Sequence, residues 1–331
     1  MGKLTRTAVL FVGALGLGII ATTAPAVAQD KLKVMTDWLP HGMHAGLFLA
    51  KQKGWFQEAG LDVEILDGRG STATIQQVGA GQIDVGFAQL AAMAVARSNG
   101  VPVTSIACYV RAGDNGVMVP KGAGYKTMKD LEGKRVAYAA ASTTGPFMDA
   151  FLKASGTSRE KMTLVNVDAS SLVNVYTSGN ADAVSSTVAF FLPIVEKVRP
   201  SEGIMWADVG LRLPGYGLLV QQRVVTERAV QLQKFVPVVN RAWSYIFDNH
   251  VDEAVDAIVK QRPNEKLDPT VLKAQMQLYM PLFATPATKG KPMGWQAEDD
   301  WADALKAMEE AGVIKPGSKP SDQFTNQFIK G

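Results

Sequence analysis

The chain has 331 residues, of which 47% are hydrophobic and 20% charged, a balance typical of a globular protein. This length is large for one hydrophobic core, so two domains are expected. The formal net charge is only +3 and no basic block suits a nucleic acid, while a single cysteine, Cys108, excludes an intramolecular disulfide.

Residues 1–28 have the pattern of an export signal. Lys3 and Arg6 give a positive start, residues 8–21 form an apolar run, and the small residues Ala-Val-Ala at 26–28 suit a signal peptidase. The apolar run is shorter than the roughly 20 residues of a membrane span, so we favour cleavage over a membrane anchor. The chain is therefore predicted to be cut after Ala28 and to act in the periplasm.

The chain then alternates short strand and helix patterns. Strand patterns lie at residues 31–35, 61–66, 83–88 and 103–110. Helical patterns lie at residues 46–59, from Gly70-Ser71-Thr72 to 78, and at 90–97. This order predicts a parallel sheet with crossover helices.

A comparable unit follows, and the chain ends in helices. The second unit has strand patterns at 135–139, 162–167 and 181–185, and helical patterns at 146–154 and 170–178. The tail has helical patterns at 228–247, 251–260, 269–280 and 298–311. Such a tail usually packs on an earlier domain.

The predicted fold is therefore α/β with two lobes, each a mainly parallel sheet flanked by helices, and a helical C-terminal segment. Residues 30–118 plus 218–331 would form the first lobe, and residues 119–217 the second. Two chain crossings, near 115–119 and 214–219, would make a hinge, with a ligand in the cleft between the lobes.

Each predicted unit has a hydroxyl-rich helix start. Ser71 and Thr72 lie in the first, and Ser142, Thr143 and Thr144 in the second. Both follow the C-terminal end of a strand, where ligands collect in open α/β sheets and helix N–H groups face outward. The alternative is that these hydroxyls only cap their helices.

The stretch DWLPHGMHAGLF, residues 37–48, follows the first strand at the same sheet edge. Its two histidines, His41 and His44, have a spacing compatible with zinc, but no third or fourth ligand stands nearby and Pro40 and Gly42 interrupt a helix. Core packing or capping is the second alternative. We favour ligand contact, because Trp38 offers a broad face to a planar molecule and a histidine offers a hydrogen-bonding group.

No catalytic set is recognisable. Cys108 lies in an apolar strand, where a structural thiol is more usual than a nucleophile, and His250 stands alone near a helix end. We therefore expect no enzyme, no metal and no cofactor.

Three runs, DWLPHGMHAGLFLAKQKGWFQEAGLDVEIL, GSTATIQQVGAGQIDVGFA and MKDLEGKRVAYAAASTTGPF, resemble periplasmic substrate-binding proteins of ABC importers. The branch includes binders of nitrate, sulfonate, taurine, riboflavin and thiamine pyrimidines, and the resemblance extends from residue 31 to at least 225. It implies a monomeric clamshell that delivers a small solute to a permease and its ATPase subunits at the inner membrane.

The Asp-Trp-x-Pro-x-x-x-His core, here Asp37, Trp38, Pro40 and His44, is most similar to the binders of thiamine pyrimidine precursors. Those proteins commonly have Asn where this chain has His41. A sulfonate or nitrate binder, with Arg69 in the site, or a binder of another small aromatic solute is the alternative. A more distant one is a thiamine pyrimidine synthase, which uses a histidine near the position of His44 and a cysteine-rich iron motif that this chain lacks.

The expected ligand stacks on Trp38 and bonds through its edge to His41 or His44. Binding would shift an open–closed equilibrium. The full set of expected ligand-binding residues is Asp37, Trp38, His41, His44, Ser71, Thr72 and Gln89 in the first lobe, and Ser142, Thr143, Thr144 and Thr187 in the second.

Overall fold

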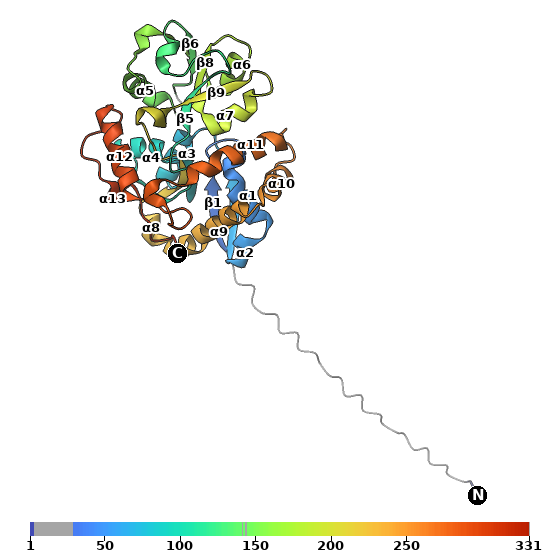
Figure 1. Ribbon diagram of the computed structural model, residues 1–331. Helices are drawn as coiled ribbons and strands as arrows, with labels where there is room; N and C mark the ends of the chain where they lie inside the picture. Colours follow the sequence, from blue (N-terminus) through green and yellow to red (C-terminus); the bar gives the residue numbers. More distant parts are fainter. Residues whose placement is uncertain (3–28, 141, 143, 331) are drawn as a thin grey trace.

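The computed structural model describes residues 1–2, 29–140, 142 and 144–330. The predicted export signal lies, apart from its first two residues, outside the described residues. Two five-stranded sheets with helices around them form two lobes, stacked one above the other in Figure 1. The predicted two-lobe α/β fold is confirmed.

The first sheet has the strand order β2-β1-β3-β10-β4. Its strands are β1 (Asp30–Met35), β2 (Leu61–Leu66), β3 (Val85–Gln89), β4 (Val103–Cys108) and β10 (Tyr216–Gln221). β1 runs parallel to β2 and β3, whereas β10 runs antiparallel to both of its neighbours. β10 is the strand on which the chain returns from the second lobe.

The second sheet has the order β7-β6-β8-β5-β9. Its strands are β5 (Asn115–Pro120), β6 (Arg135–Tyr138), β7 (Thr163–Asn166), β8 (Ala183–Thr187) and β9 (Ser201–Met205). β5, on which the chain enters this lobe, is antiparallel to β8 and β9. Both sheets are thus mixed, and the predicted lobe boundaries fall within β5 and β10.

Thirteen α-helices surround the sheets in the described chain. The first lobe has α1 (Ala45–Gln52), α2 (Trp55–Glu58), α3 (Ser71–Gly79) and α4 (Leu90–Ser98). The second has α5 (Met148–Ala154), α6 (Leu172–Thr177) and α7 (Val188–Val195). The tail has α8 (Val224–Glu227), α9 (Ala229–Phe247), α10 (Val251–Gln261), α11 (Pro269–Tyr279), α12 (Glu298–Glu310) and α13 (Pro320–Gln323).

Short 3-10 turns join several of these elements. They are η1 (Gly42–His44), η2 (Met128–Leu131), η3 (Gly145–Phe147), η4 (Arg159–Lys161), η5 (Ala169–Ser171), η6 (Trp206–Val209), η7 (Met280–Phe283) and η8 (Pro286–Thr288). No described helix is both long and apolar enough to cross a bilayer.

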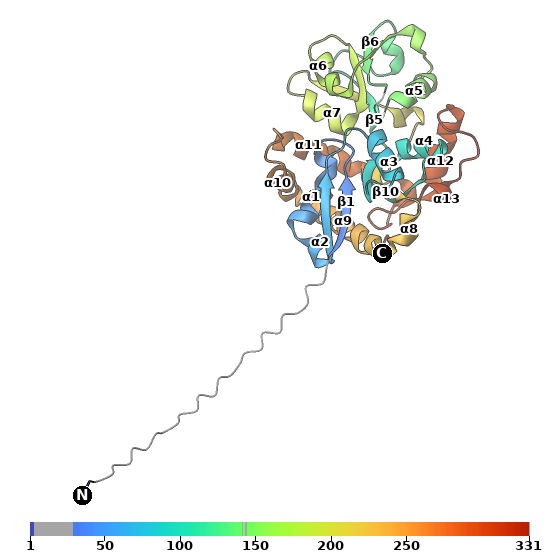
Figure 2. The same ribbon diagram turned by 180° about the vertical axis from the view of Figure 1, so that it is seen from behind.

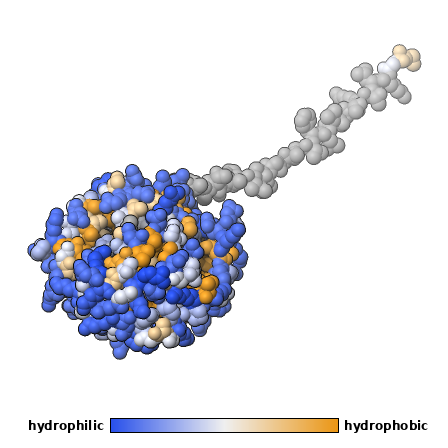
Figure 3. Space-filling view, turned by 90° about the horizontal axis from the view of Figure 1, so that it is seen from above, coloured by the Kyte–Doolittle hydropathy of each residue, from blue (hydrophilic) through white to orange (hydrophobic). Residues whose placement is uncertain are grey.

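Helices of the tail pack on helices of the first lobe, and α11 also packs on α7. α9 and α10 lie against α1, and Figure 2 shows them on the same side of the first sheet. The apolar face of α9 drives this packing: Phe235 stacks on Phe56 of α2 with ring centroids 5.4 Å apart, and Trp243 is fully buried. Seen from above, the surface is mostly hydrophilic, with an apolar patch in the middle (Figure 3).

Candidate functional site

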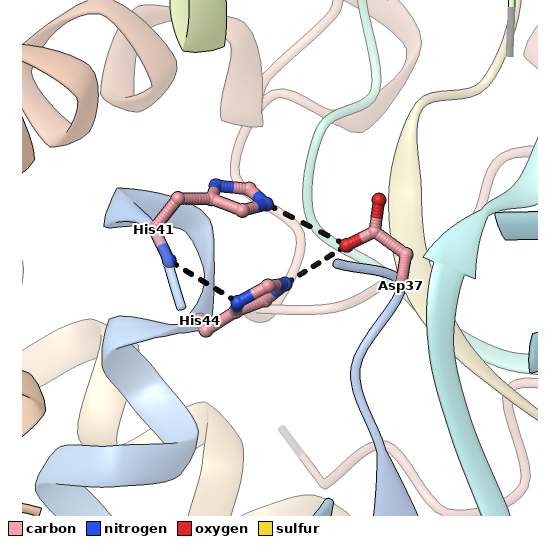
Figure 4. A group of neighbouring side chains, drawn as sticks. All are labelled: Asp37, His41 and His44. Carbon is pink, nitrogen blue, oxygen red and sulfur yellow. Dashed lines mark hydrogen bonds and ion pairs between the residues drawn. The ribbon is translucent and has the colours of Figure 1, made fainter. Parts of the chain in front are cut away.

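The turn after β1 brings three side chains together (Figure 4). Asp37 follows the strand, His41 is the N-cap of η1 and His44 is the last residue of η1. His44 Nε2 lies 2.9 Å from Asp37 Oδ1, and His41 Nε2 lies 3.5 Å from the same oxygen. All three residues are at least 95% buried, with exposed fractions of 5%, 2% and 0% in chain order.

Backbone donors determine which nitrogen of each ring carries the proton. The N–H of His41 donates to Nδ1 of His44, and the N–H of Met43 donates to Nδ1 of His41, both over 3.3 Å. A neutral imidazole that accepts through Nδ1 carries its hydrogen on Nε2. Both Nε2–H groups are therefore directed towards the Asp37 carboxylate.

The protonation states follow from burial and from these contacts. Burial raises the pKa of the Asp37 carboxyl, but its interactions with His41 and His44 outweigh burial and hold the pKa below the usual range. Burial, together with the neighbouring His41 ring, lowers the pKa of His44 to about 4. At neutral pH a neutral His44 thus supports an anionic Asp37.

The same chemistry argues against a metal ion at these residues. One possible ligand atom from each of the three residues lies within 4.8 Å of the other two, so one ion could reach all three. A ligating nitrogen must be unprotonated, and the other ring nitrogen then needs an acceptor. Here each Nδ1 faces a backbone N–H donor instead, so these imidazoles are arranged as donors to a carboxylate.

A cavity of about 330 Å³ opens beside Asp37, between the two lobes. Its first-lobe wall is formed by Asp37, Trp38, Leu39, His41, Arg69, Gly70, Ser71 and Tyr216. Its second-lobe wall is formed by Ser142, Thr144, Ala169, Ser170, Leu172, Val173, Ser186, Thr187, Phe190 and Phe191. This volume and the mainly apolar lining suit a small organic molecule.

Seven of the expected residues line this cavity: Asp37, Trp38, His41, Ser71, Ser142, Thr144 and Thr187. Three others lie off its wall. His44 is fully buried behind Asp37, Gln89 is fully buried behind Ser71, and Thr72 is exposed to solvent next to the cavity-lining Ser71. Thr143 lies outside the described residues.

The two helix starts do not use their hydroxyls as N-caps. The N-cap of α3 is Gly70, whose φ of 126° suits glycine, and Ser71 Oγ donates to Asp37 Oδ2 over 3.4 Å. In the second lobe, Ser142 Oγ donates to the carbonyl oxygen of Ala139, and Thr144 makes no capping bond through its side chain. Ser71 therefore supports the carboxylate from a second side.

A chain of buried polar groups continues from Ser71 towards β5, on which the chain enters the second lobe. The backbone N–H of Gln89 donates to Ser71 Oγ over 3.2 Å, and Gln89 Nε2 donates to Asp114 Oδ1 over 3.3 Å. Asp114 immediately precedes β5, and its carbonyl accepts from the N–H of Val188 in α7. Burial raises the pKa of the Asp114 carboxyl to about 7.

Sequence reasoning found the aromatic residue Trp38 but missed Asp114 and three other aromatic residues of the wall, Phe190, Phe191 and Tyr216. Tyr216 lies on β10, a strand without a recognised pattern, and Phe190 lies on α7, a helix that was not predicted. The signal for Phe190 was present, because Thr187 was expected in the site and an apolar run follows it. The sequence offered no comparable signal for Asp114, which precedes an unrecognised strand.

A family model described as NMT1/THI5 like matches residues 41–253. The chain is 28% identical to a putative thiamine biosynthesis protein of Haemophilus influenzae, covering 73% of this chain and 77% of that one. It is 25% identical to a formylaminopyrimidine-binding protein of Halalkalibacterium halodurans, covering 92% of each chain.

Another similarity is partial. A 4-amino-5-hydroxymethyl-2-methylpyrimidine phosphate synthase of Saccharomyces cerevisiae is 33% identical, but over only 34% of this chain and 33% of the synthase.

Solved structures share the fold. A protein of Bordetella bronchiseptica RB50 has a TM-score of 0.70 at 25% identity, covering 91% of this chain and 96% of that one. The periplasmic aliphatic sulphonate binding protein of Escherichia coli has a TM-score of 0.68 at 13% identity, covering 89% and 91%.

Proposed function

Because the chain belongs to the NMT1/THI5-like family, we propose that it is the solute-binding component of an ABC importer and captures a thiamine pyrimidine precursor. The similarity to a formylaminopyrimidine-binding protein over 92% of both chains supports this ligand class. The two-lobe fold supports a clamshell that closes on its solute and presents it to a permease. We further propose a monomer that works in the periplasm after removal of the export signal.

One observation carries the choice of ligand: an acceptor and a donor lie side by side on the cavity wall. Asp37 is an anionic acceptor, while the Nε2–H of His41, although 3.5 Å from Asp37 Oδ1, is buried and makes no hydrogen bond to any described residue. An aminopyrimidine edge has the complementary pair, an amino N–H donor beside a ring-nitrogen acceptor. Binding would pair the buried His41 N–H, which is costly when left unpaired, and would add one more donor to the Asp37 carboxylate.

Aromatic side chains complete the proposed site. Trp38 is half-buried on the cavity wall, so a ring face is open for stacking, and Phe190 stands on the opposite lobe. Of the residues off the wall, His44 and Gln89 would act through Asp37 and Ser71 rather than on the ligand. We propose no direct contact for Thr72.

A binding role without catalysis fits the remaining chemistry. The similarity to the pyrimidine phosphate synthase spans only a third of that enzyme. Burial raises the pKa of the single cysteine, Cys108, to about 12, so its thiol stays protonated at neutral pH and is a poor nucleophile or metal ligand.

An anionic ligand is the second candidate. Arg69 and the N-terminal end of α3 line the cavity beside Gly70, and this arrangement suits a sulfonate or nitrate. It leaves Asp37 facing a ligand of its own charge, which is why we place it second.

Native mass spectrometry of protein purified without refolding tests the proposal. We expect a retained mass that matches an aminopyrimidine, lost in an Asp37→Asn variant. A retained alkyl sulfonate, or formation of a pyrimidine product by the purified protein, would overturn it. If nothing is retained, added formylaminopyrimidine must bind, and its failure to bind would also overturn the proposal.

A further inference from the structure

Helix α11 of the C-terminal tail lies against both lobes (Figure 1). It packs on η1, the turn that carries His41 and His44, and on α7 of the second lobe. Its sequence position is about 80 residues beyond α7 and over 200 beyond η1. Helix α11 therefore contacts both lobes and is in a position to couple them.

A single side chain on α11 joins the two lobes. Gln275 is only 2% exposed; its Oε1 accepts from the N–H of Gly42 over 2.9 Å, and its Nε2 donates to the carbonyl oxygen of Phe190 over 2.8 Å. The amide has one acceptor and one donor end. If it were rotated by 180°, its NH2 group would face the N–H of Gly42 and its oxygen would face the carbonyl of Phe190, so neither hydrogen bond would form. The two bonds together link Gly42 of the first lobe to Phe190 of the second.

The two partners of Gln275 meet again inside the cavity. Phe190 lines the cavity, and its ring lies 5.1 Å from the ring of His41, the neighbour of Gly42. Gln275 thus hydrogen-bonds to the backbone of both segments, and the side chains of His41 and Phe190 from the same two segments are in contact at the cavity. The position of the His41 ring, and with it the proposed donor to the ligand, depends on both contacts.

Because residue 42 is a glycine, helix α11 can pack closely against the backbone of η1. A Cβ there would lie 2.8 Å from Cβ of Gln275 and 2.9 Å from the carbonyl oxygen of Leu272, distances that ordinary packing does not allow. The glycine between the histidines in PHGMH is therefore a contact surface for α11.

We propose that Gln275 is a positioning residue that couples the histidine turn to the second lobe. It stabilises the arrangement in which His41 and Phe190 are in contact, and it does so without touching the ligand. This inference goes beyond the proposed function, because the coupling exists whichever solute the cavity binds.

An ion pair on the same helices provides a matched control. Lys197 Nζ lies 2.7 Å from Asp268 Oδ2 and also joins the end of α7 to the start of α11, but both side chains are largely exposed. An exposed pair contributes little, so Lys197→Ala should leave the lobes as they are.

Distances between the lobes in ligand-free protein test the inference. Spin labels on Val198→Cys in the second lobe and Val230→Cys in the first are suitable, because both valines are highly exposed and Cys108 is buried. We expect Gln275→Leu to shift the distribution towards longer distances, lowering the compact fraction relative to the open one by roughly fivefold, as for one lost buried hydrogen bond.

Gln275→Glu separates positioning from mere packing. Ionised glutamate keeps the acceptor for Gly42 but faces the Phe190 carbonyl without a donor, so the lobes should open. Acidification protonates the carboxyl, restores the donor and should recover the compact fraction, while Gln275→Leu stays open at both pH values. The proposal would be overturned if both variants had the same distances between the lobes as the wild type. It would also be overturned if the glutamate variant were equally open at both pH values. Because no ligand is used, failure here is distinguishable from failure of the proposed function.

Discussion

The Nε2–H of His44 donates to Oδ1 of Asp37 over 2.9 Å, so a fully buried imidazole holds a carboxylate at the wall of the cavity. The ring is itself oriented by the N–H of His41, which donates to its other nitrogen. In this arrangement His44 would act on the proposed ligand only through Asp37.

Replacing His44 should therefore weaken binding indirectly. His44→Ala removes a buried ring and leaves Asp37 without its best donor, so we expect at least a tenfold loss of affinity and a loss of about 2–4 kcal/mol in unfolding free energy. His44→Gln places an amide N–H near the position of Nε2 and should recover much of the affinity. Calorimetry and urea denaturation measure both effects, and equal affinity losses in the two variants would contradict a donor role.

Ser71 and Thr72 form a matched pair of hydroxyl residues. Ser71 Oγ donates to Asp37 and accepts from the N–H of Gln89, so Ser71→Ala leaves a buried N–H unpaired and should cost about 1–3 kcal/mol of unfolding free energy, with weaker ligand binding. Thr72 is exposed, and Thr72→Ala should change neither quantity measurably. Similar effects for the two variants would contradict the placement of Ser71 beneath the carboxylate.

The buried groups Asp114 and His44 predict opposing pH effects on stability. The folded state raises the pKa of Asp114 from 3.8 to about 7, so unfolding free energy falls as pH rises through this range. It lowers the pKa of His44 from 6.5 to about 4, so unfolding free energy rises with pH between these values. From pH 4 to 6.5 the two slopes largely cancel.

Asp114→Asn should expose the contribution of His44. We expect the unfolding free energy of this variant to increase by about 1 kcal/mol per pH unit between pH 4.5 and 6, whereas that of the wild type changes little over the same range. Urea denaturation at a series of pH values measures both slopes. Adding His44→Gln should remove that increase. An Asp114→Asn variant with the pH dependence of the wild type would show that Asp114 does not hold its proton.

Arg69 distinguishes the two ligand classes. It lines the cavity and is exposed, so Arg69→Ala should leave the affinity for an uncharged aminopyrimidine within about twofold. A sulfonate would lose a charge-assisted hydrogen bond and bind roughly tenfold or more weakly. Competition binding with both compounds measures the difference, and a large loss for the aminopyrimidine would place Arg69 against its ring.

Local patterns predicted most of the elements, but not β5, β9, β10 or α7. The helix expected over 46–59 is two helices, because Gly54 with a φ of 73° separates α1 from α2. β5 and β10 were missed because they are continuous apolar strands at the lobe crossings, without a period-two pattern or a preceding helix. Their antiparallel direction follows from the chain's two passages between the lobes.

The candidate site likewise contains residues that the sequence could predict and residues that it could not. Asp37, Trp38 and His41 come from one short turn, so the sequence could place them together. Gln275 and Asp114 reach the site from distant segments by hydrogen bonds to Gly42 and Gln89. No single-sequence pattern encodes such contacts, because they depend on how the tail and the hinge pack.

Calorimetry with formylaminopyrimidine tests the central claim most directly, using the wild type, Asp37→Asn and Trp38→Ala, with Thr72→Ala as the control. The structure predicts one site per chain. Affinity should fall at least tenfold in Asp37→Asn, because the amide loses the anionic acceptor, and in Trp38→Ala, because the stacking face is lost. Unchanged affinity in both variants, or no binding of any aminopyrimidine to the wild type, would contradict the account.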